Sequence, residues 1–110
     1  MSKRNNKLLL ADILTSISKI NTYTQDLDFE AFMADSRTID AVERNFEIIG
    51  EAANQLTIEF RETHSHILWH GIISFRNRLI HGYFGVDYQI LWYLLQNDLP
   101  QLKIDLQAIE

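Results

Sequence analysis

The segment FRNRLIHGYFGVD, residues 75–87, decides how the rest of the chain is read. It places Arg76, Asn77, His81 and Tyr83 within eight residues, and it contains two of the chain's four glycines. Apolar residues recur at helical spacing before it, and Asp87 at its end is a residue type that caps helices. The segment therefore predicts a helix that ends inside it, a turn, and a second helix that begins after Asp87.

Arg76 interrupts the apolar stripe of the first of these helices. At about 3.6 residues per turn, spacings of three and four produce the stripe Trp69, Ile72, Arg76, Leu79 and Tyr83. Burying an arginine without a partner is costly, because its charge loses its hydration. Arg76 therefore needs a carboxylate, a phosphate, or water at a subunit boundary.

The other polar residues of the segment occupy different sides of the helix. His81 lies about 140° around an ideal helix from Arg76, so these two side chains do not share a face. Asn77 and His81 do share one, because they stand at positions i and i+4. Arg78 occupies a third side, which we expect to face water. Tyr83 follows the glycine after His81, where helical geometry no longer sets a direction.

The composition predicts one small globular domain. A chain of 110 residues that is 46% hydrophobic and 23% charged is long enough for one core and argues against disorder. It has no cysteine, so it forms neither a disulfide framework nor a thiolate metal site, which fits a reducing cytoplasm. The apolar run LLLA near the N-terminus is too short for a signal peptide or a membrane span. We therefore expect a single cytoplasmic domain over residues 1–110.

The net charge limits how the chain can bind nucleic acid. At a formal charge of −5, the surface as a whole repels phosphate. Any contact with RNA must then be local, through Arg61, Arg76, Arg78 and the histidines.

Apolar periodicity predicts an all-α bundle of four main helices and one or two short ones. The alternation typical of β-strands is absent. Pro100 lies inside the last helix and predicts a kink or a short break, with the apolar phase retained. The residues expected to start helices are Asp28, Asp35 or Ser36, Thr57 and Asp87. The expected helices cover about 7–22, 29–34, 36–56 and 57–63, the stretch before His81, and 88 to the C-terminus.

The helix over residues 36–56 is predicted to be central, because it is apolar on two sides. Gly50 in its interior would allow a neighbouring helix to approach closely. Glu43, Glu47 and Glu51 line its remaining face at spacings of four. Such an acidic row is either solvated surface or a source of partners for a buried arginine.

The histidines raise the question of a metal site. His66 and His70 stand at positions i and i+4, with His64 two residues earlier, and this spacing can hold zinc on one helix face. Only Glu62 is near enough in the sequence to serve as a further ligand. We therefore favour histidines at the surface or at a helix start, and we predict no metal site.

Two interpretations of Arg76, His81 and Tyr83 are open on the residues alone. In the first, they form a polar cluster at a helix end, where the helix dipole favours a protonated histidine. In the second, they cleave RNA, whose 2′-hydroxyl is the nucleophile. A histidine, with an unperturbed pKa of about 6.5, then transfers protons, and an arginine stabilises charge on phosphorus without a metal. One histidine per chain is half of an acid–base pair, so a two-fold dimer would complete such a site.

Residues 76–84, RNRLIHGYF, resemble the R-x4-H-x-Y motif of HepT toxins in the HEPN superfamily. DSRTIDAVERNFEIIGEAANQL at 35–56, and GVDYQILW followed by NDLP at 85–100, also look like that family. The similarity extends from about residue 28 to residue 102, with the segments in matching order. One difference is the run SHIL before Trp69, where the family would have a proline.

The resemblance implies a HEPN-type antiparallel bundle that forms a homodimer, with two motif helices meeting at a cleft. That cleft would be a composite, metal-independent endoribonuclease site that uses no cofactor. Arg76 would stabilise the phosphate, His81 would act as acid and base, and Asn77 would orient the site. Arg78 is a candidate contact to the RNA.

The resemblance also implies a protein partner, a minimal nucleotidyltransferase antitoxin. This antitoxin would transfer AMP to the motif tyrosine, Tyr83, and so neutralise the toxin. The physical effect is plain, because each AMP places a bulky anion beside the arginine and repels RNA phosphate.

A second hypothesis belongs to a different class of function. The chain would then be a non-catalytic helical module that binds a nucleotidyltransferase or a nucleotide through the same arginine and tyrosine. The net charge of −5 favours this hypothesis, whereas the histidine favours cleavage, because binding alone does not need it.

Overall fold

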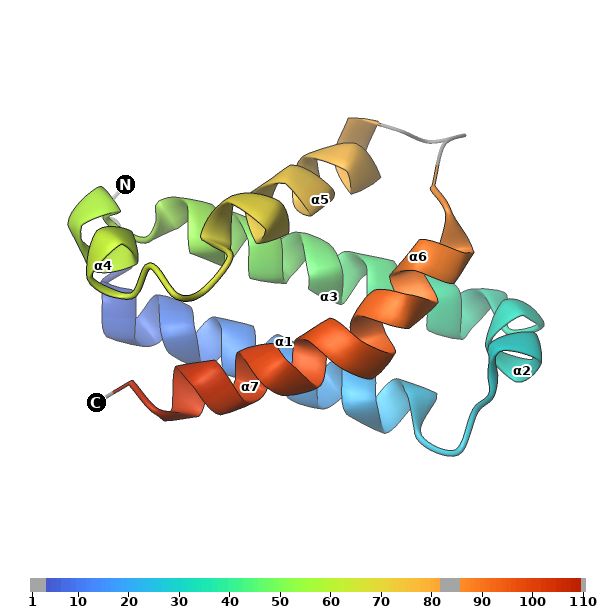
Figure 1. Cartoon of the computed structure of the whole chain (residues 1–110). Coiled ribbons are helices and arrows are strands. Elements are labelled where there is room, and N and C mark those ends of the chain that lie inside the picture. Colours follow the sequence, from blue (N-terminus) through green and yellow to red (C-terminus); the bar gives the residue numbers. More distant parts are fainter. Residues whose placement is uncertain (1–3, 82–85, 110) are drawn as a thin grey trace.

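The computed structural model describes residues 4–81 and 86–109, apart from the side chains of residues 80 and 81 (Figure 1). No strand occurs in this described part, which confirms the predicted all-α class. The elements in chain order are α1 (Asn6–Thr24), α2 (Phe29–Met33), α3 (Ser36–Gln55), α4 (Ile58–Thr63), α5 (Trp69–His81), α6 (Tyr88–Tyr93), the π-helix η1 (Leu94–Asp98) and α7 (Leu99–Gln107).

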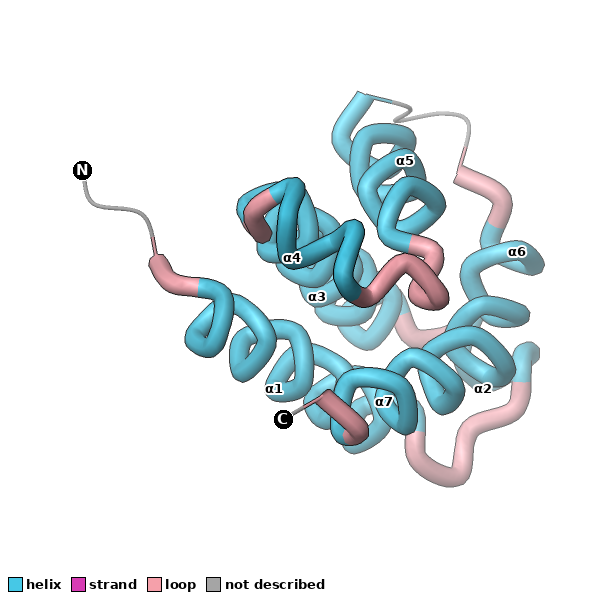
Figure 2. The backbone as a smooth tube through the Cα atoms, turned by 60° about the vertical axis from the view of Figure 1, so that its left-hand side comes forward, coloured by secondary structure: helices cyan, strands magenta, loops and turns pink. Residues whose placement is uncertain are grey.

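The four main helices run alternately up and down, as α1, α3, α5 and the continuous rod α6–η1–α7 (Figure 1). Helix α3 is central and makes its most extensive contacts with α1 and α5. The same arrangement is seen after rotation in Figure 2, where α5 and α7 lie on different sides of α3. The core is filled by apolar side chains from these helices and from α2, including Ile13, Ile17, Phe32, Val42, Ile49, Leu91, Leu95 and Leu106.

The predicted helix starts are confirmed as side-chain caps. A capping oxygen satisfies backbone N–H groups that have no partner within the first helical turn. Asp28 Oδ1 accepts from the Ala31 N–H at 2.8 Å and Thr57 Oγ1 from the Phe60 N–H at 3.1 Å. Asp35 caps α3, and Asp87 accepts from the first turn of α6. Hydrogen bonds from the Thr38 hydroxyl and backbone hold the pKa of Asp35 below its usual value.

The turn before α5 forms without a proline. The Ile67 N–H donates to the His64 carbonyl at 3.1 Å, and the Trp69 N–H donates to the Ile67 carbonyl at 2.9 Å. The indole Nε1 of Trp69 also donates to the His64 carbonyl at 3.1 Å. Because Trp69 and Ile67 are buried, the start of α5 is fixed by packing as well as by hydrogen bonds.

Pro100 does not break the last helix. The chain stays helical from Tyr88 to Gln107, and the disturbance predicted at the proline takes the form of the π-helix before it. The Leu99 N–H donates to the Leu94 carbonyl, five residues back. A wider turn at this point gives room for a ring that clashes with the preceding α-helical turn. The apolar phase is retained as predicted, because Leu95 and Leu99 before the proline and Leu102 and Leu106 after it are all buried.

Gly50 explains how closely α3 and α5 approach. A Cβ atom built on Gly50 would lie 2.1 Å from Arg76 Cβ and 2.7 Å from Arg76 Cγ. It would also lie 3.2 Å from the Ile72 carbonyl oxygen, which is backbone and cannot rotate away. The predicted role of Gly50 in a close helix contact is therefore confirmed, and the partner residue is Arg76.

Gly50→Ala is expected to destabilise the fold, although alanine is the better helix former. The methyl group must push α5 away from α3, and overpacking of this kind costs about 1–3 kcal/mol, more than the gain in helix propensity of about 1 kcal/mol. Denaturant unfolding of the purified chain measures the difference.

Gly71→Ala is the matched control, because nothing lies within 4 Å of a Cβ at Gly71. We expect this substitution to raise the unfolding free energy by up to about 1 kcal/mol. An unchanged or raised stability of Gly50→Ala would show that α3 and α5 are not in tight contact.

Candidate functional site

Arg76 lies at the contact between α3 and α5, where its stem packs against Gly50. Its side chain is 24% exposed, so most of it is withdrawn from water. Residues on both sides of it along the stripe, Trp69 and Leu79, are buried as the helical spacing predicted. The predicted interruption of an apolar seam by an arginine is therefore confirmed.

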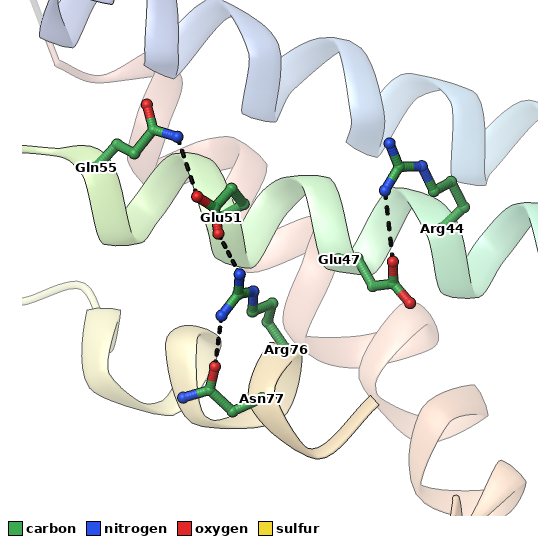
Figure 3. A network of polar contacts seen from close by, with 6 residues as sticks. All are labelled: Arg44, Glu47, Glu51, Gln55, Arg76 and Asn77. Atoms are coloured by element: carbon green, nitrogen blue, oxygen red, sulfur yellow. Dashed lines mark hydrogen bonds and ion pairs between the residues drawn. The ribbon is translucent and has the colours of Figure 1, made fainter. Parts of the chain in front are cut away.

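The guanidinium of Arg76 is held by two oxygen atoms (Figure 3). Arg76 Nη2 forms a short ion pair with Glu51 Oε2 of α3, and Nη1 donates to Asn77 Oδ1 at 2.7 Å. The second carboxylate oxygen of Glu51 accepts from Gln55 Nε2 at 3.1 Å. A chain of polar contacts thus runs from Gln55 through Glu51 and Arg76 to Asn77.

One nitrogen of the guanidinium is unsatisfied. Arg76 Nε is buried and has no hydrogen-bond partner among the described residues. A buried donor without a partner costs about 1–3 kcal/mol.

The acidic row on α3 is more than solvated surface. Glu51 pairs with Arg76 of α5. Glu47 pairs within α3, where its Oε2 atom lies 3.5 Å from Arg44 Nη1. Glu43 is partly buried, and its Oε1 atom has no partner among the described residues. Its burial raises the pKa of the Glu43 carboxyl, against a smaller lowering by the hydrogen bond from the Tyr88 hydroxyl of α6. Burial and this same hydrogen bond raise the pKa of Tyr88.

Only some of the predicted site residues lie in the described part of the chain. Arg76 and Asn77 are brought together, and Arg78 is exposed as expected. His81 is the last residue of α5, and its side chain lies outside the described part of the structure. Tyr83 lies outside the described residues. The roles of all five residues stay predictions.

An apolar groove of about 620 Å³ is a second candidate site, which the sequence did not indicate. Its floor includes Phe46 and Ile49 of α3, and its walls come from α5 and from the rod α6–η1–α7. Arg78 contributes to its rim, but Arg76 does not line it. The groove and the Arg76 cluster therefore lie at different sides of α5.

The histidines before α5 form no cluster with other ligands. In the described ranges no three His, Asp or Glu side chains are grouped so that they could hold a metal ion. His64 packs on the ring of Phe60, with ring centroids 4.6 Å apart. His66 and His70 are exposed. These positions fit the preferred interpretation of histidines at the surface and at a helix start.

Glu51 is the residue that sequence reasoning did not single out. Its spacing within the acidic row was visible, but Glu43 and Glu47 share that spacing. Only the packing of α5 on α3 at Gly50 brings the arginine next to one particular carboxylate.

Glu43→Gln is expected to change how stability depends on pH. Because the pKa of Glu43 is raised in the folded state, the folded chain holds more protons than the unfolded chain between pH 4.5, the ordinary pKa of a glutamate, and the raised pKa. The unfolding free energy should therefore fall as the pH rises from about 4.5 toward the raised pKa. The glutamine variant should lose this slope and be more stable than the original chain at pH 7. Thermal unfolding between pH 4 and pH 8 measures the effect.

Glu62→Gln serves as the control for this substitution, because Glu62 is exposed on α4 and its charge is not among those that raise the pKa of Glu43. If the unfolding free energy of Glu43→Gln fell with pH as steeply as that of the original chain, the pH dependence would belong to another group.

The fold and site define a class of protein, a small helical bundle with a carboxylate-paired arginine in the helix that carries the R-x4-H sequence. The family description "Ribonuclease HepT-like" matches residues 13–109. The chain belongs to the HepT-like ribonuclease family.

Curated relatives agree with this family. A probable ribonuclease HepT of Thermococcus cleftensis is 42% identical over 101 residues, which cover 92% of each chain. A putative RNase of Methanocaldococcus jannaschii is 38% identical over 109 residues, 99% of this chain and 100% of that protein. A putative RNase of Caldanaerobacter subterraneus is 38% identical over 100 residues, 91% of this chain and 89% of that protein. No solved structure matches. No helix of the described part is long and apolar enough to cross a membrane.

Proposed function

We propose that this chain is a metal-independent endoribonuclease and the toxin subunit of a toxin–antitoxin pair. The observation that carries the proposal is Arg76, a partly buried arginine whose Nε atom has no partner among the described residues, five residues before His81 in a member of the HepT-like ribonuclease family. The relatives are named as probable or putative ribonucleases, which supports RNA as the substrate.

The proposed reaction uses the nucleophile that RNA itself carries. His81 takes the proton of a 2′-hydroxyl, the 2′-oxygen attacks the adjacent phosphorus, and the bond from phosphorus to the 5′-oxygen breaks. A second histidine protonates the leaving 5′-oxygen, so the products are a cyclic phosphate and a 5′-hydroxyl. Arg76 stabilises the charge that develops on the phosphoryl oxygens.

The second histidine comes from a second copy of the chain. Each chain has one motif histidine, and an acid–base pair needs two, so the proposed site is composite and lies at the cleft of a homodimer. The partly exposed face of Arg76 is consistent with a site that a partner copy completes. Asn77, which already bonds the guanidinium, orients the site, and the exposed Arg78 contacts RNA outside the cleft.

The proposed antitoxin is a minimal nucleotidyltransferase that transfers AMP to Tyr83. Attack of the tyrosine oxygen on the α-phosphorus of ATP forms the phosphodiester and releases pyrophosphate. Tyr83 stands two residues after His81 in the sequence, so its AMP group would lie near the reacting phosphate. The added anion and its bulk would exclude RNA.

A second candidate function is a non-catalytic module that binds the nucleotidyltransferase or a nucleotide. The pairing of Arg76 with Glu51 favours the module that binds the nucleotidyltransferase, because the carboxylate offsets the charge available to a phosphate of RNA or of a nucleotide. The net charge of −5, doubled in a dimer, also weakens RNA binding. Cleavage by the purified chain separates the two functions.

Arg76→Ala and His81→Ala are expected to lower the rate of RNA cleavage strongly and to leave a small residual rate that can still be measured. Loss of an acid–base group alone lowers a rate by about 100- to 10,000-fold. The assay uses purified chain, total RNA and excess EDTA, with product ends mapped for cyclic phosphate. His70→Ala is the matched control, because His70 is exposed at the start of the same helix. Unchanged cleavage by His81→Ala would sink the catalytic proposal and leave the binding module.

Co-expression with the proposed nucleotidyltransferase antitoxin is expected to add one or more AMP groups to Tyr83 and to end RNA cleavage. Intact mass and peptide mapping measure the modification. Tyr83→Phe should stay unmodified, whereas Tyr93→Phe, an exposed tyrosine of α6, should be modified like the original chain. AMP on another residue, or neutralisation with Tyr83 unmodified, would contradict this mode of control.

A further inference from the structure

We infer that Glu51 is a positioning residue for RNA cleavage, which acts by fixing the guanidinium plane of Arg76. The inference rests on the proposed function, because it assigns a role within that site. Glu51 belongs to α3 and has no role in the proposed proton transfers, so we expect its effect on the rate to pass through Arg76, with which it pairs.

The backbone brings the two residues together. At Gly50 the stem of Arg76 lies against α3 with no room for even a methyl group. The next residue along α3 is Glu51, so the guanidinium emerges beside its carboxylate. An arginine side chain that is not held in this way samples many rotamers. Close packing of the stem and an ion pair at the head remove that freedom before RNA arrives.

The hydrogen bonds leave part of the guanidinium available. Each terminal nitrogen carries two hydrogens, and each uses one of them, toward Glu51 or toward Asn77. One hydrogen on each terminal nitrogen is therefore left to donate to a phosphate, in the forked geometry that suits two oxygens. Glu51 itself is held by Gln55, which limits the motion of the whole cluster.

The charge of Glu51 separates positioning from binding. A carboxylate beside the arginine repels a phosphate, so Glu51 does not improve ground-state binding of RNA. Its benefit lies in the rate, because a guanidinium displaced by about 1 Å can cost on the order of 100-fold. Removal of Glu51 should therefore lower kcat and leave KM unchanged or lower.

The test combines Glu51→Ala and Glu51→Gln with Arg76→Ala in a double-mutant cycle, using the purified full chain and a defined RNA. We expect Glu51→Ala to lower kcat by about 10- to 100-fold without raising KM. The kcat of Glu51→Gln should lie between those of Glu51→Ala and the original chain, because the glutamine amide oxygen still accepts a hydrogen bond from Arg76 Nη2. In the Arg76→Ala background, Glu51→Ala should have no further effect.

Glu47→Gln is the matched control, because Glu47 has the same side chain one turn earlier on α3 and pairs with Arg44 instead. It should retain the original kcat. Thermal unfolding of every variant reports the folded fraction. If Glu51→Ala is less stable, the double-mutant cycle still tests the inference, because a loss of folded chain would appear in both backgrounds.

Three outcomes would overturn the inference. A kcat of Glu51→Ala within about two-fold of the original, or above it, would show that Glu51 does not position Arg76. Equal losses in both backgrounds would show that Glu51 acts on the fold. A raised KM would show that it serves binding. Failure of the proposed function gives a different result. Arg76→Ala and the original chain would then cleave RNA at the same rate, or neither would cleave it.

Discussion

The close approach of α3 and α5 at Gly50 is the constraint on which the site depends. A side chain of any size at this position would meet the stem of Arg76 and the backbone at Ile72. With hydrogen as the side chain, the two helices pack closely enough for a residue of one to pair with a residue of the other. The cost is a weaker helix at Gly50, offset by the apolar burial of α3 against both α1 and α5.

Electrostatics explains why an arginine is tolerated at this contact. The chain is acidic overall, and α3 presents a row of carboxylates on the side from which Arg76 approaches. Withdrawing the guanidinium of Arg76 from water costs free energy, and the ion pair with Glu51 offsets that cost. The pairing is incomplete, because Nε has no acceptor among the described residues. At a net charge of −5 the surface as a whole repels phosphate, so under the proposed function RNA would be recognised locally, at this cation.

The rest of the fold serves to hold α5 in place. Buried Trp69 fixes the start of the helix, and Leu79 anchors its later part. The rod α6–η1–α7 stays continuous past Pro100 because the π-helix before the proline gives its ring room, so its leucines keep one face toward the core. Helix α5 contacts α3 far more than it contacts that rod, which leaves the apolar groove between them. Nothing in the described chain fills this groove.

The sequence by itself determined the helix class, the capping residues and the apolar phases, because spacing and cap chemistry act within a few residues of the chain. It also predicted that Gly50 allows a close helix contact and that an arginine on an apolar seam needs a partner. Which carboxylate is that partner was decided by tertiary structure alone, since Glu43, Glu47 and Glu51 repeat at one spacing. The register of two packed helices selects Glu51, and local sequence does not encode that register. The groove was likewise invisible in the sequence, because it is a property of three helices packed together.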